Sequence, residues 1–398
     1  MKKIIAISVM FVLLTGAVFA ADIGVTVIGT VDVVKSDTGD DAKMTTEGGL
    51  DRLRLSGSGE NDDGSFGGWF RLDALGSTAA DDWSAAGYAF WKPVDQVKMI
   101  IGSFPDGLWG KEGVTGWGFA QMVSDTGVSL QGGHVYGSGV LGLNTRQAFF
   151  GGQGDGGLMF EISPAEIASI NIFLPAFDGG KSYKNDAGVY AKDIGESETG
   201  NVFASATAQL SLNLDFGNIA ITYMGKPKYY NYWAPEATGS VIYAYFGGNF
   251  GSLSLDVGLG YQMAAEDKVA QPITFGVGVK YAADSFGVKF RAIASLAGDN
   301  KTTTFFADLL PYFILSDSMR AFVSVGVGML MPDGGDTVSA FHFNPWIEVG
   351  QEWGPAFYVG LKVEKSSVGD PYGLGYDYAS KDVDTITWSV PVALIVSF

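Results

Sequence analysis

Apolar residues alternate with small or polar residues through the last fourteen positions of the chain, Thr385 to Phe398. A period of two indicates a β-strand with different surroundings on its two faces. Because water disfavours such an apolar face and lipid does not, we expect a lipid-facing strand that closes a barrel. The residues on this apolar face are Ile386, Trp388, Val390, Val392, Leu394, Val396 and Phe398.

The same alternation recurs in interior segments, including residues 209–216, 253–261 and 357–364. In each, Leu, Val, Phe or Tyr occupies one face, and the other face is mostly polar or small, with Gln, Ser, Asn, Asp, Lys, Glu or Gly at all positions but Tyr358. Charged residues on the second face indicate that it meets water. The pattern predicts an all-β protein, a transmembrane antiparallel up-and-down β-barrel. A soluble sandwich or a repeat protein would also be rich in strands and glycine, but the final strand favours the barrel.

Connections between the expected strands alternate between short and long. Eight short turns and nine longer loops predict eighteen strands, with sixteen as the alternative, and short turns are typical of the periplasmic end of outer-membrane barrels. The count depends on residues 107–156, where 119–123 and 129–135 could be two further strands or parts of one folded loop. Short turns are expected near residues 62, 93–95, 163–166, 215–218, 249–252, 283–285, 316–318 and 353–355.

The first twenty residues have the pattern of a secretory signal peptide. Lys2 and Lys3 precede an apolar run, and small residues around Ala20 fit a cleavage site after that residue. A retained transmembrane helix would need about 20 apolar residues, and this run is shorter. We expect a signal peptide over residues 1–20 and an outer-membrane barrel over residues 21–398.

The charge of the chain argues against a nucleic-acid partner. The formal net charge is −18, and removal of Lys2 and Lys3 leaves 23 basic against 43 acidic residues, or 23 − 43 = −20. Such a chain has little attraction for phosphate backbones. The acids concentrate in turn-like stretches, where solvated loops are the simplest interpretation. The absence of cysteine excludes disulfides and a lipoprotein anchor.

Residues for catalysis or cofactor binding are scarce. The chain has two histidines, His134 and His342, and neither has a second histidine or a cysteine nearby. We interpret His342 as a polar group on an inward strand face rather than a catalytic base. Residues 152–157 match a G-x-G-x-x-G pattern, but no buried strand precedes it and no helix follows. We therefore expect no enzyme activity, no cofactor and no metal site.

An informative polar cluster lies on the first predicted hairpin. Arg52 and Arg54 share one strand face, and Arg71 lies on the corresponding face of the next strand. Three arginines would then face the lumen from adjacent strands. They could pair with wall carboxylates such as Asp51 or Asp73 and only stabilise the barrel. Alternatively, they could face acids on an infolded loop and select solutes by polarity.

These segments resemble the Gram-negative general-diffusion porins of the outer membrane. The resemblance lies in residues 25–32, 53–60 and 66–72, in residues 97–104 followed by Pro105-Asp106-Gly107, and in the final strand. It covers about the first quarter of the chain and its end. The acidic composition and Pro-Asp-Gly also resemble spirochaete outer-membrane porins.

The resemblance implies an infolded loop 3, residues 105–156, that narrows the pore. The arginines of the hairpin would then form a basic side of the constriction and acids of the loop the other side. The loop is longer than usual and has two tryptophans, which departs from the common acidic loop of that family. They could stack against sugar rings or pack the loop on the wall. The resemblance also implies a homotrimer, assembled into the outer membrane by the barrel-assembly machinery through Phe398. The expected pore residues are Arg52, Arg54, Arg71 and Lys98 (basic), Asp106, Glu112 and Asp125 (acidic), and Trp109 and Trp117.

The sequence therefore predicts an outer-membrane porin, a passive channel for small hydrophilic solutes or ions, with sugars as one candidate class. Its expected partners are the lipid of the outer membrane and the small hydrophilic solutes that pass through it. The alternative is a surface adhesin or antigen whose barrel has a closed lumen and serves as an anchor, with binding by loops 178–200 and 366–382. Conductance distinguishes the two.

Overall fold

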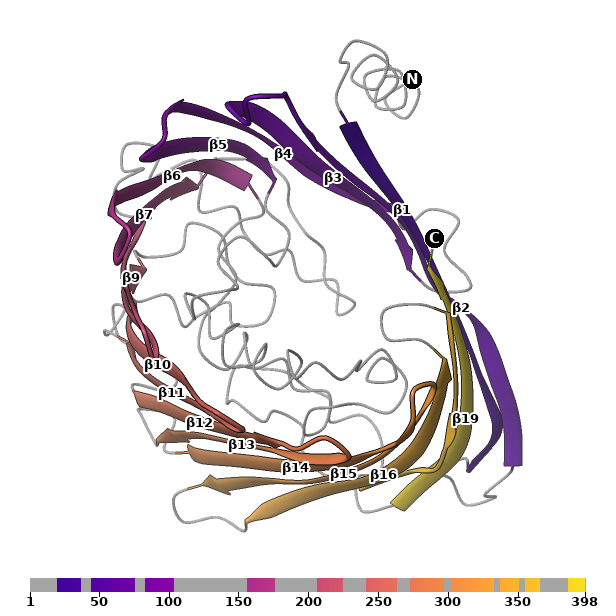
Figure 1. Ribbon diagram of the computed structural model, residues 1–398. Helices are drawn as coiled ribbons and strands as arrows, with labels where there is room; N and C mark the ends of the chain where they lie inside the picture. The colour runs from indigo at the N-terminus through magenta and orange to yellow at the C-terminus, as the bar shows by residue number, and fades with distance from the viewer. Residues whose placement is uncertain are drawn as a thin grey trace, which may run out of the picture.

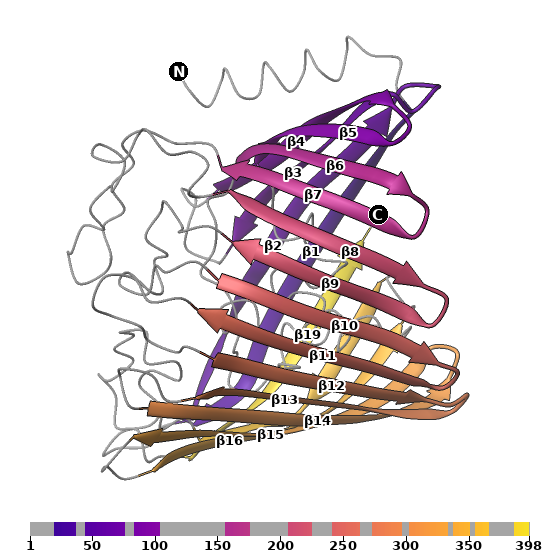
Figure 2. The ribbon, with the colours of Figure 1, turned by 90° about the vertical axis from the view of Figure 1, so that its left-hand side faces the viewer.

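The protein is an antiparallel β-barrel, as the alternation predicts. The computed structural model describes residues 20–36, 44–75, 83–103, 156–175, 206–224, 241–262, 273–296, 302–332, 337–350, 355–365 and 386–397. Seen along its axis, the barrel is a closed ring of strands (Figure 1). From the side, the strands are inclined to the axis (Figure 2), which closure of a sheet requires. No helix among the described residues is long and apolar enough to cross a membrane.

The strands follow one another around the ring in chain order. The first half comprises β1 (Ala20–Ser36), β2 (Met44–Glu60), β3 (Phe66–Leu75), β4 (Trp83–Val94), β5 (Val97–Ser103), β6 (Gly156–Ala165), β7 (Ala168–Pro175), β8 (Thr207–Leu214) and β9 (Gly217–Met224). The second half comprises β10 (Val241–Phe250), β11 (Leu253–Gln262), β12 (Ile273–Ala282), β13 (Phe286–Leu296), β14 (Thr302–Ser316), β15 (Met319–Pro332), β16 (Val338–Gly350), β17 (Ala356–Gly360), β18 (Lys362–Lys365) and β19 (Ile386–Ser397).

The barrel has eighteen strands, which confirms the first of the two predicted counts. The described residues form nineteen strand segments, but β17 and β18 both pair with β16 on one side and with β19 on the other. They are two parts of one strand, interrupted at Leu361, so the count is 19 − 1 = 18. Seven of the eight predicted short turns lie within the described residues and join the strand pairs where they were expected. Most of the eighth, at residues 353–355, lies outside the described residues.

The C-terminal strand closes the barrel against the first strand. β19 pairs with β1 in an antiparallel register in which Ile395 lies opposite Ile28 and Ala393 opposite Thr30. Closure leaves no unpaired sheet edge, which would be costly in lipid. The start of β1 and the end of β19 lie toward the end of the barrel that carries the short turns, since Ala20 pairs with Glu60 beside the β2–β3 turn and Ser397 pairs with Thr26.

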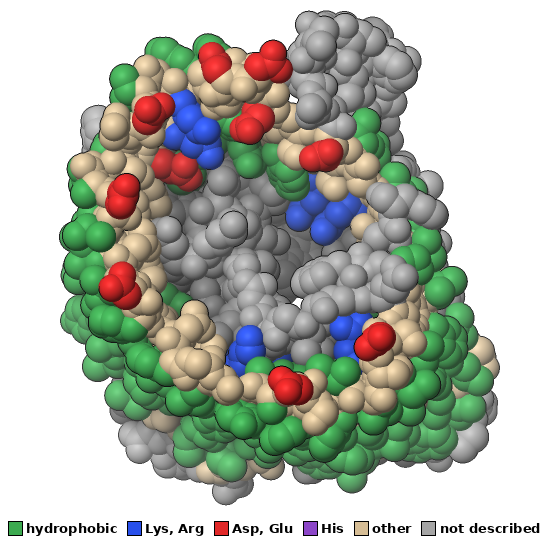
Figure 3. Space-filling model, viewed as in Figure 1, with side chains coloured by type: hydrophobic (Ala, Val, Ile, Leu, Met, Phe, Trp, Pro, Cys, Tyr) green, Lys and Arg blue, Asp and Glu red, His purple; other side chains and the backbone are tan. Residues whose placement is uncertain are grey.

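The outer face of the barrel is apolar. Side chains such as Leu259 (49 % exposed) and Leu394 (53 % exposed) point away from the barrel, while their neighbours in sequence are buried. Hydrophobic side chains accordingly form the outer rim in Figure 3. Eight of the exposed aromatic residues lie near the short turns, where an aromatic girdle is typical of membrane barrels. They are Phe66, Trp91, Phe216, Phe250, Tyr281, Phe286, Phe313 and Phe357.

Two turns show why the chain reverses where it does. In the β2–β3 turn, Gly64 has a φ of 67° and donates its N–H to the carbonyl of Asn61 at 2.8 Å. The Asn61 side chain accepts the N–H of Phe66 at 2.8 Å and so fixes the start of β3. Gly251 in the β10–β11 turn also has a φ of 67°. Glycine is favoured at both positions because other residues rarely adopt a positive φ.

Candidate functional site

The candidate site is the inner wall of the barrel, because the strand register brings polar side chains from all parts of the chain onto it. Residues paired across neighbouring strands share a face. For example, Ser56 on β2, Arg71 on β3 and Ala86 on β4 are paired in turn and form one row across the inner face. Seen along the axis, Lys and Arg side chains point from this wall into the hollow (Figure 3).

The predicted arginines lie together on β2 and β3. Arg54 is opposite Asp73 in the register, and Arg71 is opposite Ser56. The two pairs are neighbouring rows on the inner face. The side chains of Arg54 and Arg71 are partly exposed. Arg52 lies two positions before Arg54 and pairs with Ile28 on β1 and Leu75 on β3. The structure thus brings the three positions to one part of the inner wall, and their role in a pore stays a prediction.

Lys98 lies on the inward face of β5 and is paired with an acid. Its Nζ is 3.4 Å from a carboxylate oxygen of Glu161 on β6, and the two side chains are 26 % and 30 % exposed. Its Nζ also lies over the ring of Phe90, 4.7 Å from the centroid. Lys98 therefore occupies a wet part of the wall, although a neighbouring carboxylate offsets its charge.

The predicted residues of the constriction loop lie outside the described residues. They are Asp106, Trp109, Glu112, Trp117 and Asp125. The same holds for Phe398 at the end of the final strand and for His134. The acidic side of the expected constriction therefore stays a prediction.

Aromatic side chains on β3 and β4 form a part of the wall that the sequence analysis did not single out. Trp69 and Tyr88 are opposite each other and stack with ring centroids 5.9 Å apart and an interplanar angle of 24°. Arg71 lies over Trp69 at 5.9 Å, and Lys92 lies over Phe90 at 5.3 Å. Inward alternation on β4 was the available signal, because it places Tyr88, Phe90 and Lys92 on one face.

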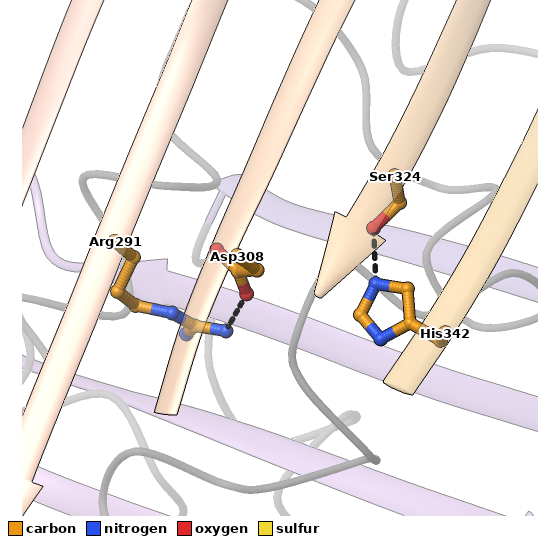
Figure 4. Close-up of polar contacts among 4 residues, drawn as sticks. All are labelled: Arg291, Asp308, Ser324 and His342. Carbon is orange, nitrogen blue, oxygen red and sulfur yellow. Dashed lines mark hydrogen bonds and ion pairs between the residues drawn. The ribbon is translucent and has the colours of Figure 1, made fainter. Parts of the chain in front are cut away.

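The wall formed by β13 to β17 contains buried ion pairs that the sequence analysis also missed. Arg291 on β13 pairs with Asp308 on β14 at 2.6 Å, and their side chains are 8 % and 3 % exposed (Figure 4). Arg320 on β15 pairs with Glu348 on β16 at 2.5 Å. Each pair lies directly opposite in the register, so two charges that face inward compensate each other.

His342 faces inward from β16, in agreement with the sequence analysis, but it is buried. The Ser324 hydroxyl on β15 is 2.7 Å from its Nε2 (Figure 4), and the residue is 1 % exposed. The imidazole ring lies over Gly326, its register partner, in space that a β-carbon would occupy. Among the described residues, no group of three His, Cys, Asp or Glu side chains could hold a metal ion.

The inner wall differs in exposure around the ring. The charged inward side chains on β2 to β6, such as Arg54, Arg71 and Lys98, are partly exposed, whereas Ile100 on β5 and Met159 on β6 are buried in an apolar cluster. Inward side chains on β13 to β16 are buried, including Lys289 at 1 % and an aromatic cluster of Tyr312, Phe322 and Trp346. Phe322 and Trp346 stack at 4.8 Å with an angle of 10°. Water therefore reaches the wall at the charged positions of β2 to β6 and not at those of β13 to β16.

Solved structures of outer-membrane channels share this architecture. The anion-selective porin from Comamonas acidovorans matches 96 % of this chain and 100 % of its own at a TM-score of 0.51 and 13 % identity. The chain has the porin fold. OccK11 (OpdR) from Pseudomonas aeruginosa matches at a TM-score of 0.52 and 8 % identity over 95 % of this chain and 96 % of its own. OmpF of Salmonella typhi, in complex with daunomycin, matches at a TM-score of 0.51 and 11 % identity over 95 % of this chain and 97 % of its own.

Sequence comparisons add no family to this result. No protein-family model and no curated protein sequence matches the chain. At such low identities the likeness establishes the porin fold alone, and the solutes of those proteins do not transfer to this one.

Proposed function

We propose that this chain is an outer-membrane porin, a passive diffusion channel for small hydrophilic solutes or ions. The observation that carries the proposal is a closed eighteen-stranded barrel with an apolar outer face and a charged, partly exposed inner face. Barrels of sixteen to eighteen strands leave an aqueous channel, whereas eight strands fill the interior with side chains. The proposed activity is a channel and not an enzyme.

The location follows from the same features. An outward apolar face with an aromatic girdle suits a bilayer, and single-chain barrels with short turns at one end are typical of the bacterial outer membrane. We infer export by a signal peptide over residues 1–20, from the basic, apolar and small-residue pattern of that segment. A homotrimer and assembly through the C-terminal strand and Phe398 are further parts of the proposal, drawn from the resemblance to general-diffusion porins.

The proposed constriction combines the described wall with the loop of residues 105–156. Arg52, Arg54 and Arg71 would form its basic side together with Lys98, and acids of the loop would form the other. Facing charges of opposite sign in a narrow passage select solutes by polarity. Sugars are a possible solute class if Trp109 and Trp117 line the passage, since indole rings stack on sugar rings.

Single-channel conductance of the refolded protein, lacking residues 1–20, tests this proposal. Wild type should give large steady steps in planar bilayers. The variant Arg52→Ala/Arg54→Ala/Arg71→Ala should still conduct, with its ion selectivity shifted toward cations because three positive charges leave the wall.

The matched control is Leu53→Ala/Leu55→Ala/Leu72→Ala, which changes outward positions of the same two strands and should keep the wild-type selectivity. Absence of conductance from wild-type protein with a folded barrel would refute the channel and favour the adhesin anchored by a closed barrel.

A further inference from the structure

Cationic side chains on β3 to β5 are held against aromatic rings along the exposed part of the inner wall. Arg71 lies over Trp69, and both Lys92 and Lys98 lie over Phe90, at 5.9, 5.3 and 4.7 Å from the ring centroids. Cations are attracted to the negative face of an aromatic ring. We call Trp69, Arg71, Tyr88, Phe90, Lys92 and Lys98 the cation–aromatic strip.

The strip runs along the barrel wall toward the short turns. In the β3–β4 register, Arg71 lies in the row of Ala86, Trp69 in the row of Tyr88, and Gly67 in the row of Phe90. Lys92 follows beside Ser65, whose carbonyl accepts its backbone N–H at 2.7 Å. Along β4, Lys92 lies six residues beyond Ala86, the partner of Arg71, which is about 20 Å at the rise of a β-strand.

The rings restrict where the charges lie. Lys and Arg side chains on a wet surface have high rotamer entropy, and a contact with a ring face reduces the conformations they sample. Gly67 leaves room for this arrangement, because a β-carbon there would lie within 2.5 Å of the Phe90 ring. Two ring faces are thus occupied by cations, which makes the strip a charged surface rather than an apolar platform for sugars.

Carboxylates lie beside the two lysines of the strip. Glu161 pairs with Lys98, and Glu60 lies near Lys92, since both side chains approach Gly64. The cations of the strip are also partly exposed, in contrast to Lys289 and Arg291 on the opposite wall, which are 1 % and 7 % exposed. Exposed positive charge beside water attracts mobile anions.

We propose that Trp69 and Phe90 are positioning residues for a path of small anions, such as chloride or simple carboxylates, along β3 to β5. The rings hold Arg71, Lys92 and Lys98 toward the water, and the cations conduct anions between the middle of the barrel and its short-turn mouth. This inference rests on the proposed channel function, and it adds the ion class and the residues that determine it.

Ion selectivity under a KCl gradient tests the inference. In Trp69→Leu/Phe90→Leu, which removes all three cation–ring contacts, we expect single-channel steps to persist while the permeability ratio of chloride to potassium falls about twofold or more, since one exposed contact of this kind corresponds to a factor of about two to five. The aromatic replacements Trp69→Phe/Phe90→Tyr should keep the wild-type ratio, because a ring face remains at each position.

Phe66→Leu/Trp91→Leu is a matched control on the same two strands. These rings also stack, at 6.1 Å and 15°, but they are exposed on the lipid side, so the ratio should not change. Lys92→Gln/Lys98→Gln removes the charges themselves, leaves every ring in place and should lower the ratio as well.

Each outcome separates the two proposals. A conducting channel whose chloride-to-potassium ratio is unchanged in Lys92→Gln/Lys98→Gln would overturn the anion path and leave the porin standing. A ratio that falls in the lysine variant but not in Trp69→Leu/Phe90→Leu would overturn the positioning role of the rings. Folded wild type without conductance would overturn the channel itself.

Discussion

At the scale of single residues, the inner wall contains ion pairs with very different exposure, and their contributions to stability should differ accordingly. Arg291–Asp308 is almost fully buried, whereas Lys98–Glu161 is about one quarter exposed. Removing one partner of a buried pair leaves a charge without compensation in a poorly hydrated place. A pair in contact with water contributes little, because water replaces the missing partner.

We expect Arg291→Met to lower the free energy of unfolding by about 3–5 kcal/mol. Lys98→Met should lower it by less than about 1 kcal/mol. Arg291→Met/Asp308→Leu should recover most of the loss, since it removes the second charge as well. Urea unfolding in lipid vesicles, followed by tryptophan fluorescence, measures all three. Equal losses for the two single variants would contradict the assignment of Arg291 to a dry part of the wall.

The sequence predicts which residues share a strand face, whereas partners across strands depend on the register. Arg52, Arg54 and Arg71 were found because they share the inward face of one hairpin, β2 and β3, with a five-residue turn. Arg291 and Asp308 lie on β13 and β14, whose connection is also five residues long. Alternation gives the face of each of these residues, but the residue that lies opposite depends on where each strand ends, and that required the structure. The contact of Ser324 with His342 across β15 and β16 required it for the same reason.

At the scale of elements, most of the barrel was predictable because each turn and each strand obeys a local rule. Gly, Asn and Asp mark the short turns, and a period of two marks the lipid face. The beginning of β2 was not predicted. This strand begins at Met44, although Glu47, Gly48 and Gly49 interrupt the apolar pattern, because its backbone continues to pair with β1 as far as Ser36.

The lipid-facing assignment of a strand gives a prediction for β11. Leu259 is 49 % exposed on the outer face. Leu259→Arg should lower the free energy of unfolding by about 2–4 kcal/mol, because an arginine near the middle of a bilayer is poorly solvated. Ser56→Arg, at a partly exposed inward position of β2, is the control and should be tolerated. The two variants are compared by urea unfolding and by heat-dependent mobility on gels. Similar stability would place Leu259 away from lipid.

At the scale of the whole molecule, charge is distributed unevenly between the wall and the mouth of the barrel. Acids occupy most of the described short turns and form a ring around the mouth that faces the viewer in Figure 3. All are exposed: Asp62, Asp63, Asp95, Glu166, Asp215, Asp284 and Asp317. Hydrogen bonds from Ser65 lower the pKa of Asp63 below its usual range, so this carboxyl stays ionised as the pH falls. Anions that reach the inner wall through this mouth must pass the acidic ring.

Salt should therefore separate the effect of the ring from that of the wall. The Debye length is about 10 Å at 0.1 M salt and about 3 Å at 1 M, so exposed acids act on a passing ion mainly at low salt. In Asp95→Asn/Glu166→Gln/Asp215→Asn/Asp284→Asn/Asp317→Asn, we expect the chloride-to-potassium permeability ratio to rise about twofold or more near 0.1 M KCl and to equal that of wild type near 1 M. Reversal potentials in planar bilayers measure both conditions. An increase that persists at 1 M would mean that these acids contact permeating ions directly, and no increase at 0.1 M would mean that ions do not pass this ring.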